Sequence, residues 1–237
     1  MLISAFNRTT SADGQLQYIE AIDLALTQDI LPGIRSIVVR SDILRVTGSI
    51  TLPGQNLTIL CRRLICTGSP TISTAATGTI LSYTNQSAAV GGSNGANGST
   101  GADGGVGGNG GDIAVVVGSP EGALLLDSSG QNGGDAQSGG DGANGQPGLD
   151  WSPTSGLVAG GNGGNGGQGG LPGKPGSGGN AGKISFYSMQ PLTPGQLTTT
   201  SRKGNAGGIG RYGAPGAAGR AGSGGTLTQN QWGHCTY

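Results

Sequence analysis

The chain has 237 residues, of which 53 are glycine, while 10% are charged and 4% are aromatic. Its 12 basic and 12 acidic residues cancel, and no basic patch interleaved with aromatic residues occurs, so we expect no nucleic-acid partner. No apolar run approaches the roughly 18 residues that a membrane span needs, so we expect no membrane span.

A short amphipathic helix is predicted near the N-terminus, within residues 13–28. Apolar residues recur there at helical spacing: Leu16, Ile19, Ile22 and Leu26. Pro32 and Gly33 follow as a stop signal. Such a helix would either cover the open end of a β-structure or dock the chain onto a partner, and the sequence leaves both roles open.

Residues 37–53 and 57–73 align with each other at an offset of 20 residues. The aligned pairs are Val39 with Ile59, Leu44 with Leu64, Thr47-Gly48 with Thr67-Gly68, and Leu52 with Ile72. Short β-branched segments that repeat at a fixed period are typical of the stacked rungs of a β-solenoid. Two unrelated strand pairs of a β-sandwich are the alternative.

Beyond residue 90, glycine occupies every third position in four blocks. The blocks are residues 92–110, residues 133–148 with Ala136 as the one break in the frame, residues 161–182 and residues 204–225. Three residues per turn is the period of the polyproline II helix, whose backbone groups bond only to neighbours or water. The chain has only 11 prolines and many Gly-Gly pairs, which disfavours collagen. The frame predicts a bundle of polyglycine II helices with the third block most enclosed, and a flexible linker is the alternative.

Strand-like pieces lie between the blocks at residues 113–117, 123–126 and 184–187. We therefore expect an all-β fold combined with polyglycine II and a short N-terminal helix. Residues 1–90 would form the helix and the β-solenoid-like rungs, as a cap or attachment domain. Residues 91–237 would form the glycine-rich bundle with interspersed strands and loops.

Signatures of catalysis are absent, so we expect no enzyme, no catalytic residue and no cofactor. The single histidine, His234, adjoins Cys235, and neighbouring residues of an extended chain point to opposite sides. Residues 107–115 fit the calcium-binding nonapeptide once, with Asp112 as the ligand, but the motif works in tandem and we predict no metal site. Asp112 would instead cap the transition from glycine helix to strand. Cys61 and Cys66 lie in predicted strands, and whether they or Cys235 form disulfides stays open.

Candidate binding residues lie where aromatic and arginine side chains interrupt the glycine pattern. They are Trp151, Arg211, Tyr212 and Trp232. Trp151 belongs to the turn at residues 149–156, and a second long loop is expected at residues 190–204. Such side chains on loops held by a rigid scaffold are typical of binding surfaces, although they could equally anchor the loops against the bundle.

The order of strands and glycine blocks resembles known families. RVTGSITLPGQNLTIL at residues 45–60, GGDIAVVV at 110–117 and GKISFYSM at 182–189 look like glycine-rich modules of large bacterial and fungal proteins, which alternate β-solenoid rungs with glycine excursions. That resemblance covers residues 35–225 and implies no established activity. The glycine blocks also resemble the polyglycine II sandwich of T-even-like phage tail-fibre adhesins, whose interrupting loops bind the host receptor, and springtail antifreeze proteins.

The sequence predicts a non-enzymatic recognition or structural protein, in which a rigid glycine scaffold presents loops to a surface receptor or a glycan. Residues 1–14 lack the regions of a signal peptide, so an extracellular, virion or cell-surface location would be reached by lysis or dedicated export. A self-assembling extracellular filament protein, whose copies stack through their solenoid ends, is the alternative. Ice binding is a third hypothesis, which the outward Asn, Asp, Gln and Lys residues disfavour.

Overall fold

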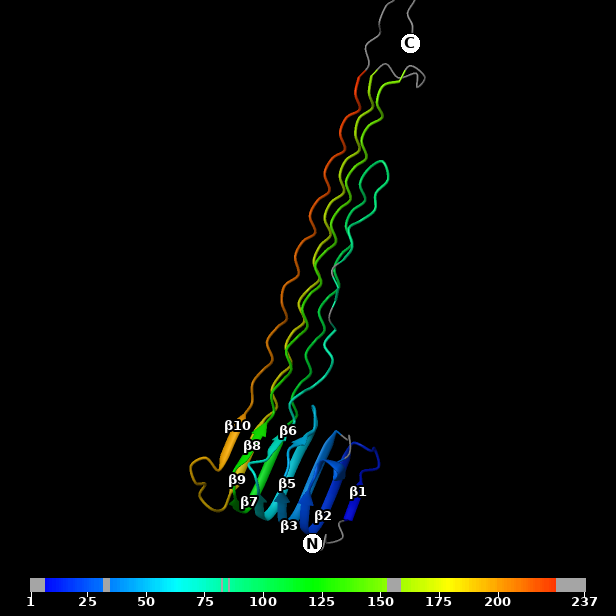
Figure 1. The fold of residues 1–237 in the computed structure, drawn as a ribbon. Coiled ribbons are helices and arrows are strands. Elements are labelled where there is room, and N and C mark those ends of the chain that lie inside the picture. The colour runs from blue at the N-terminus through cyan, green and yellow to red at the C-terminus, as the bar shows by residue number, and fades with distance from the viewer. Residues whose placement is uncertain (1–6, 32–34, 82, 85, 153–158, 225–237) are drawn as a thin grey trace, which may run out of the picture. The chain divides into compact units, whose positions relative to one another are not determined.

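The computed structural model describes residues 7–31, 35–81, 83–84, 86–152 and 159–224 (Figure 1). These residues form an all-β protein with ten strands and one short 3-10 helix, η1 (Gln28–Ile30). Two compact units share the chain. Unit 1 comprises Met1–Ile80, Gly105–Gly134 and Gly176–Gly207, and unit 2 comprises Leu81–Gly104, Asp135–Pro175 and Gly208–Tyr237. No helix among the described residues has the length and apolar character to cross a bilayer.

Unit 1 contains two sheets whose neighbouring strands are parallel, except for the β1–β2 pair. The six-stranded sheet consists, in spatial order, of β1 (Asn7–Thr10), β2 (Leu16–Leu26), β3 (Ser36–Val46), β5 (Asn56–Cys66), β7 (Ile113–Glu121) and β9 (Ile184–Ser188). The four-stranded sheet consists of β4 (Ile50–Thr51), β6 (Thr71–Ser73), β8 (Leu124–Asp127) and β10 (Leu197–Thr200). The strands predicted at residues 113–117, 123–126 and 184–187 are thus confirmed.

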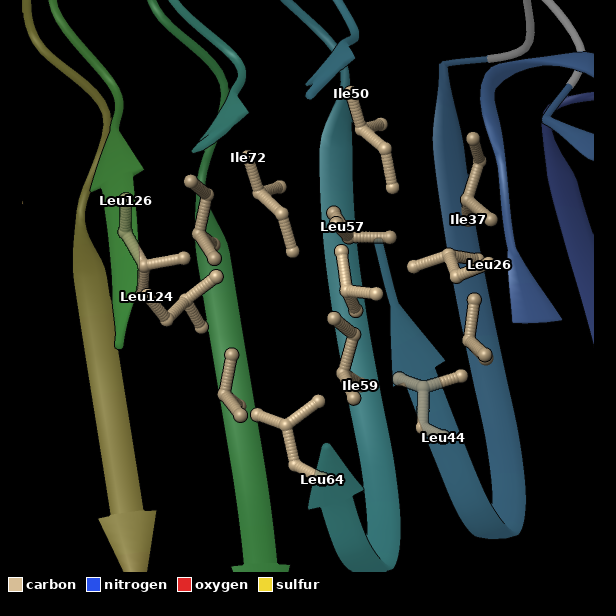
Figure 2. Packing of buried hydrophobic residues seen from close by; sticks show 14 of the residues in the cluster. Leu26, Ile37, Leu44, Ile50, Leu57, Ile59, Leu64, Ile72, Leu124 and Leu126 are labelled. Atoms are coloured by element: carbon tan, nitrogen blue, oxygen red, sulfur yellow. The ribbon is translucent and has the colours of Figure 1, made fainter. Parts of the chain in front are cut away.

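The apolar core of unit 1 lies between the two sheets. Figure 2 shows side chains of both sheets, among them Ile59 of β5 and Ile72 of β6, directed into the shared interior. Ile59 and Ile72 are both fully buried. The 20-residue offset is confirmed, because Val39 of β3 pairs with Ile59 of β5, and it extends back to Ile19 of β2. Residues at equivalent positions of successive strands therefore lie side by side in columns, which buries β-branched side chains against each other.

The helix predicted within residues 13–28 is wrong, because this stretch is mostly strand β2. Ile19 and Leu24 both point into the core, whereas Ile22 is 75% exposed. The inward phase of β2 changes from odd to even positions near Ile22, where the pairing with β3 skips one residue. The helical spacing arises because Leu16 and Ile22 are apolar although they lie outside this inward phase, so they combine with the buried Ile19 and Leu26 into spacings of three and four. Parallel pairing along β3 decides in favour of the strand.

The predicted pairing of Leu52 with Ile72 is also wrong, since Ile72 pairs with Ile50. Counted between paired positions, the chain from Cys66 to Ile72 is two residues longer than the chain from Val46 to Ile50. It contains Gly68 and Ser69, both with positive φ. This left-handed corner shifts the four-stranded sheet to an offset of 22 residues, while the six-stranded sheet keeps 20.

Glycine-rich excursions leave unit 1 from the four-stranded sheet and return to the six-stranded one. One lies between β6 and β7, another lies between β8 and β9, and a last stretch follows β10. Buried hydroxyls mark the junctions: Thr74 Oγ1 donates to the Gly111 carbonyl at 2.6 Å, and Ser128 Oγ donates to the Gly182 carbonyl at 2.8 Å. Each hydroxyl satisfies a buried carbonyl where the chain changes from strand to glycine segment.

Unit 2 is built from four glycine segments that hydrogen-bond to one another (Figure 1). Within this unit they are the first segment (residues 91–104), the second (135–150), the third (159–175) and the fourth (208–224). Bonds recur every three residues, and the first and third segments run parallel: Gly95, Gly98 and Gly101 donate to the carbonyls of Asn165, Gln168 and Leu171 at 2.7–2.8 Å. The third runs antiparallel to the second: Gly164, Gly167 and Gly170 donate to Gln146, Ala143 and Gly140, each at 2.8 Å. The fourth runs antiparallel to the third in the same way: Gly213, Gly216 and Gly219 donate to Gly170, Gly167 and Gly164 at 2.8–2.9 Å.

Close backbone approach explains why two frames of the third segment are glycine as far as Gly170. A Cβ atom on Gly167 would lie 1.9 Å from the Ala96 carbonyl oxygen of the first segment. On Gly166 it would lie 2.0 Å from the Gly216 carbonyl oxygen of the fourth. The third segment therefore contacts all three others, and so does the second. Between Ala159 and Gly170, side chains occur only on the remaining frame of the third segment, which is exposed, and Pro172 and Pro175 then take the Gly166 frame.

Candidate binding surface

Polar side chains of unit 2 accept hydrogen bonds from those backbone N–H groups that do not belong to the hydrogen-bonded glycines. On the first segment Asn94, Asn97 and Asp103 accept from residues of the third, and the bonds are Asn165 N–H at 3.0 Å, Gln168 N–H at 2.9 Å and Lys174 N–H at 2.7 Å. On the second segment Ser138, Asp141, Asn144 and Asp150 accept from the fourth, and the donors are Arg211, Ala214, Ala217 and Ser223 at 2.7–3.0 Å. All these bonds join segments that run parallel.

These caps give the polar residues of the glycine pattern a structural role. They are solvent-facing, yet one oxygen of each is committed to a backbone N–H, as in the N-cap of a helix. The role is missing from the expectations above, although the signal is visible, since Asn94, Asn97 and Asp103 share one three-residue frame. Surface polarity in these frames is therefore poor evidence for a ligand site.

Replacing Asp141 by alanine is expected to destabilise unit 2 by about 1 kcal/mol, because the Ala214 N–H loses its 2.7 Å acceptor. Asp141→Asn keeps an acceptor oxygen at the same place and is the matched control. Urea unfolding and amide exchange at Ala214 measure the effect. Equal exchange at Ala214 in the two variants would contradict the capping role.

The fourth segment carries the most conspicuous unpartnered surface of unit 2. Its glycine frame bonds to the third segment, and a second frame is capped by the second segment. The remaining frame, which we name the outer ridge, consists of Ile209, Tyr212, Pro215, Ala218 and Ala221. Its backbone makes no hydrogen bond to any residue that the structure describes. Ile209 is 83% exposed and Tyr212 is 74% exposed.

The chemistry of the outer ridge suits recognition. Five residues without charge follow one another at three-residue intervals, which corresponds to about 9 Å in a polyproline II geometry. Arg211 and Arg220 lie on the neighbouring frame, are exposed, and form no ion pair with the described part of the chain. An aromatic ring beside free guanidinium groups can stack on apolar faces and bind hydroxyl, carboxylate or phosphate oxygens.

Four arginines of the six-stranded sheet differ, because each is paired with a carboxylate: Arg40, Arg45, Arg62 and Arg63. Arg45 Nε lies 2.9 Å from Asp23 Oδ1, and Arg62 Nε lies 2.6 Å from Asp42 Oδ1. The hydrogen bonds from these arginines lower the pKa of both carboxyls. The contribution of each pair to stability is thus present at neutral pH and is lost as the pH falls through the lowered pKa. Both pairs are largely exposed, so this contribution is small.

The structure separates the predicted binding residues. Arg211 and Tyr212 are adjacent on the fourth segment and exposed. Trp151 is half-buried, and its backbone N–H donates to the Ser223 carbonyl at 2.9 Å. Ser223 lies 12 residues beyond Arg211 along that segment. Trp232 lies outside the described residues. The long loop expected at residues 190–204 contains strand β10, so only its first part is a loop.

Each unit also has a shallow hollow. In unit 1 a hollow of about 530 Å³ is lined by Asn7, Glu20, Ile22 and Arg40, among others. In unit 2 one of about 500 Å³ is lined by Asn94, Pro147, Leu149 and Asn162, among others. The second hollow is a secondary candidate for a small ligand, because Leu149 is 74% exposed beside uncharged amides.

Asp112 serves as a cap. Its Oδ1 accepts the Lys183 N–H at 2.7 Å, where a glycine segment becomes strand β7. Among the residues that the structure describes, no three His, Cys, Asp or Glu side chains gather as a metal site would require. His234 and Cys235 lie outside the described residues.

Cys61 and Cys66 are free thiols of β5. Burial raises the pKa of Cys61 to about 12 and that of Cys66 to about 11. Since the thiolate is the reactive form, both are packing residues at neutral pH.

No family of known proteins, no curated protein and no solved structure matches the chain.

Proposed function

We propose that the protein is a non-enzymatic recognition protein, in which polyglycine II helices and β-solenoid rungs form a rigid scaffold. The outer ridge and its arginines bind a surface receptor or a glycan. The observation that carries the proposal is the contrast within unit 2. Polar side chains of the first and second segments are occupied as caps, whereas the outer ridge has exposed apolar side chains and no backbone partner in the described part of the chain.

The polyglycine II assignment has two supports in the backbone. The hydrogen bonds of unit 2 recur every three residues and join separate segments, as in helices that lack internal bonds. Among the described glycines, those with positive φ are Gly14, Gly54, Gly68, Gly122 and Gly195, all outside the glycine segments. The β-solenoid assignment rests on columns of equivalent residues in parallel strands.

An extracellular, virion or cell-surface location accords with this role. The stability of unit 2 depends more on backbone hydrogen bonds than on apolar burial. A rigid scaffold with exposed binding side chains suits a protein that binds its receptor outside the cell. A glycan is a suitable ligand, because sugar rings offer an apolar face to Tyr212 and hydroxyls to Arg211.

Binding to a glycan array tests the proposal. We expect labelled protein to bind at least one glycan class, and Tyr212→Ala and Ile209→Ser to weaken that binding at least about tenfold, as the loss of interface anchors does. Leu171→Ser is the matched control, because Leu171 is an apolar residue of the third segment that is 58% exposed. Equal binding by the Tyr212 and Leu171 variants would contradict the outer ridge as the binding surface.

A further inference from the structure

The stack of strands in unit 1 stops abruptly at β9 and β10. Along the columns of the core, Ile113 and Val115 of β7 are 1% and 0% exposed. Their partners on β9, Ile184 and Phe186, face the same core but are only half-buried. Ile184 and Phe186 occupy the same positions as Ile113 and Val115. Their greater exposure therefore arises because no further strand of the described chain is stacked on β9.

The four-stranded sheet ends in the same way. Leu126 of β8 is fully buried, whereas its partner Thr199 on β10 is exposed. Leu197 pairs with Leu124 and is half-buried against the core. Both sheets therefore end in a strand that no further strand of the described residues pairs with, and we name β9 and β10 together the open end.

The opposite end of the stack is closed by specific contacts. The Gln28 side chain bonds twice to Thr51 of the edge strand β4: Nε2 donates to the Thr51 carbonyl at 3.0 Å, and Oε1 accepts the Thr51 N–H at 2.8 Å. This amide imitates a neighbouring strand. Leu31 is 7% exposed and belongs to the core, and β1 covers β2 in antiparallel orientation. Further strand pairing at this end is therefore blocked in the four-stranded sheet.

The open end lacks the usual protection of an edge strand. Backbone groups of Lys183 and Met189 bond to β7, so by alternation those of Ile184, Phe186 and Ser188 face away from it. Along β10 the carbonyls of Gln196 and Thr200 accept from Leu124 and Ser128, at the start and just after the end of β8, so the backbone groups of Leu197 and Thr199 face away from β8. Neither strand contains a charged residue or a proline, the devices that normally prevent edge pairing.

We infer that the open end pairs with the open end of a second copy, so that β9 meets β9 and β10 meets β10 in antiparallel orientation about a two-fold axis. Both sheets then continue across the interface, as in β-strand addition. Centred on Phe186, this register places Phe186 opposite its equivalent and Ile184 opposite Ser188. Lys183 falls opposite Met189, so no like charges meet.

The two ends also limit the assembly. A head-to-tail contact that continues both sheets would need a free edge at β4, which Gln28 occupies. An isologous contact uses each open end once and closes at two copies. The interface does not depend on what the outer ridge binds, since every residue in it belongs to unit 1.

The test is the mass of the full chain in solution, measured by sedimentation from micromolar to millimolar concentration. We expect the mass to rise from one to two chain masses and to stop there. Thr199→Lys and Phe186→Lys place a charge in the interface and are expected to weaken dimerisation at least about tenfold. Thr199 is exposed, so Thr199→Lys leaves the monomer folded. Val106→Lys, at a site of unit 1 that is 75% exposed, controls for added charge.

Amide exchange at Phe186 and Thr199 provides a second measurement, with protection that increases at dimer concentrations. A wild-type chain that stays monomeric throughout overturns the inference. So does growth beyond two copies, or a dimer that persists unchanged in both lysine variants.

Discussion

Replacing Gly167 by valine is expected to unfold unit 2, whereas replacing Asn165 by valine leaves it folded. The two residues belong to the same segment but to different frames. A Cβ atom on Gly167 would lie 1.9 Å from the Ala96 carbonyl oxygen, and the Gly167 N–H already donates to Ala143. The side chain of Asn165 is exposed, and its two backbone bonds do not require an asparagine.

The effect at Gly167 is large because backbone, not side chain, blocks the added atoms. A flexible side chain could rotate away, but the Ala96 carbonyl is held by its own bond from the Ala143 N–H. Apolar burial in unit 2 cannot offset the free energy lost when a segment is displaced, because Ala143 is the one buried apolar residue among the described residues of this unit. We expect a loss of more than about 3 kcal/mol, in the range of severe overpacking.

Thermal and urea unfolding followed by circular dichroism measure this difference, with Gly164→Val as an independent repeat. The Cβ of Gly164 would meet the Ser93 carbonyl oxygen at 1.6 Å. Similar unfolding midpoints for the Gly167 and Asn165 variants would show that the glycine frame is a linker without close packing.

Replacing Ile19 by alanine is expected to cost about 3 kcal/mol, whereas replacing Ile22 by alanine changes the stability by less than about 0.5 kcal/mol. Ile19 is fully buried and pairs with Val39 in the next strand, while Ile22 is 75% exposed. In a helix these two isoleucines would lie one turn apart on the same face and both variants would be costly. In β2 they face opposite sides.

Urea unfolding of the two variants measures this difference with the same chemical change at both sites. Removing either side chain deletes the same atoms, so the ratio of the two losses reports burial alone. Comparable losses at Ile19 and Ile22 would contradict the strand and favour the amphipathic helix.

The parallel strands β3 and β5 of unit 1 could be predicted from the sequence because they share their local pattern. Val39 and Ile59 stand 20 residues apart, and so do the residues around them, so the register is readable. The strand β2 could not be predicted in this way, since its partner β3 decides the structure and a local phase change hides the alternation. The corner at Gly68 and Ser69 likewise changes the offset in one sheet and leaves the other unchanged.

The glycine segments show a different limit. A three-residue frame indicates that neighbours approach closely, but it does not say which segments are neighbours. Parallel contacts are specified by the polar caps, such as Asp141 with Ala214, and each cap bridges more than 70 residues of sequence. Of the candidate binding residues, Arg211 and Tyr212 could be predicted because they interrupt a small-residue pattern. The outer ridge as a whole, with Pro215 and Ala218, could not be predicted, because it is defined by the hydrogen-bond partners of the other two frames of the fourth segment.

Amide hydrogen exchange along the fourth segment, measured by NMR on the folded protein, tests most directly that the glycine segments are an ordered, hydrogen-bonded scaffold. The structure gives Gly213 and Gly216 carbonyl acceptors and Ala214 a carboxylate acceptor, whereas Tyr212 and Ala218 have no acceptor among the described residues. We predict slow exchange at the first three amides and fast exchange at the last two, repeating every three residues. Fast exchange at all of them, without a three-residue period, would contradict the scaffold and show a flexible chain.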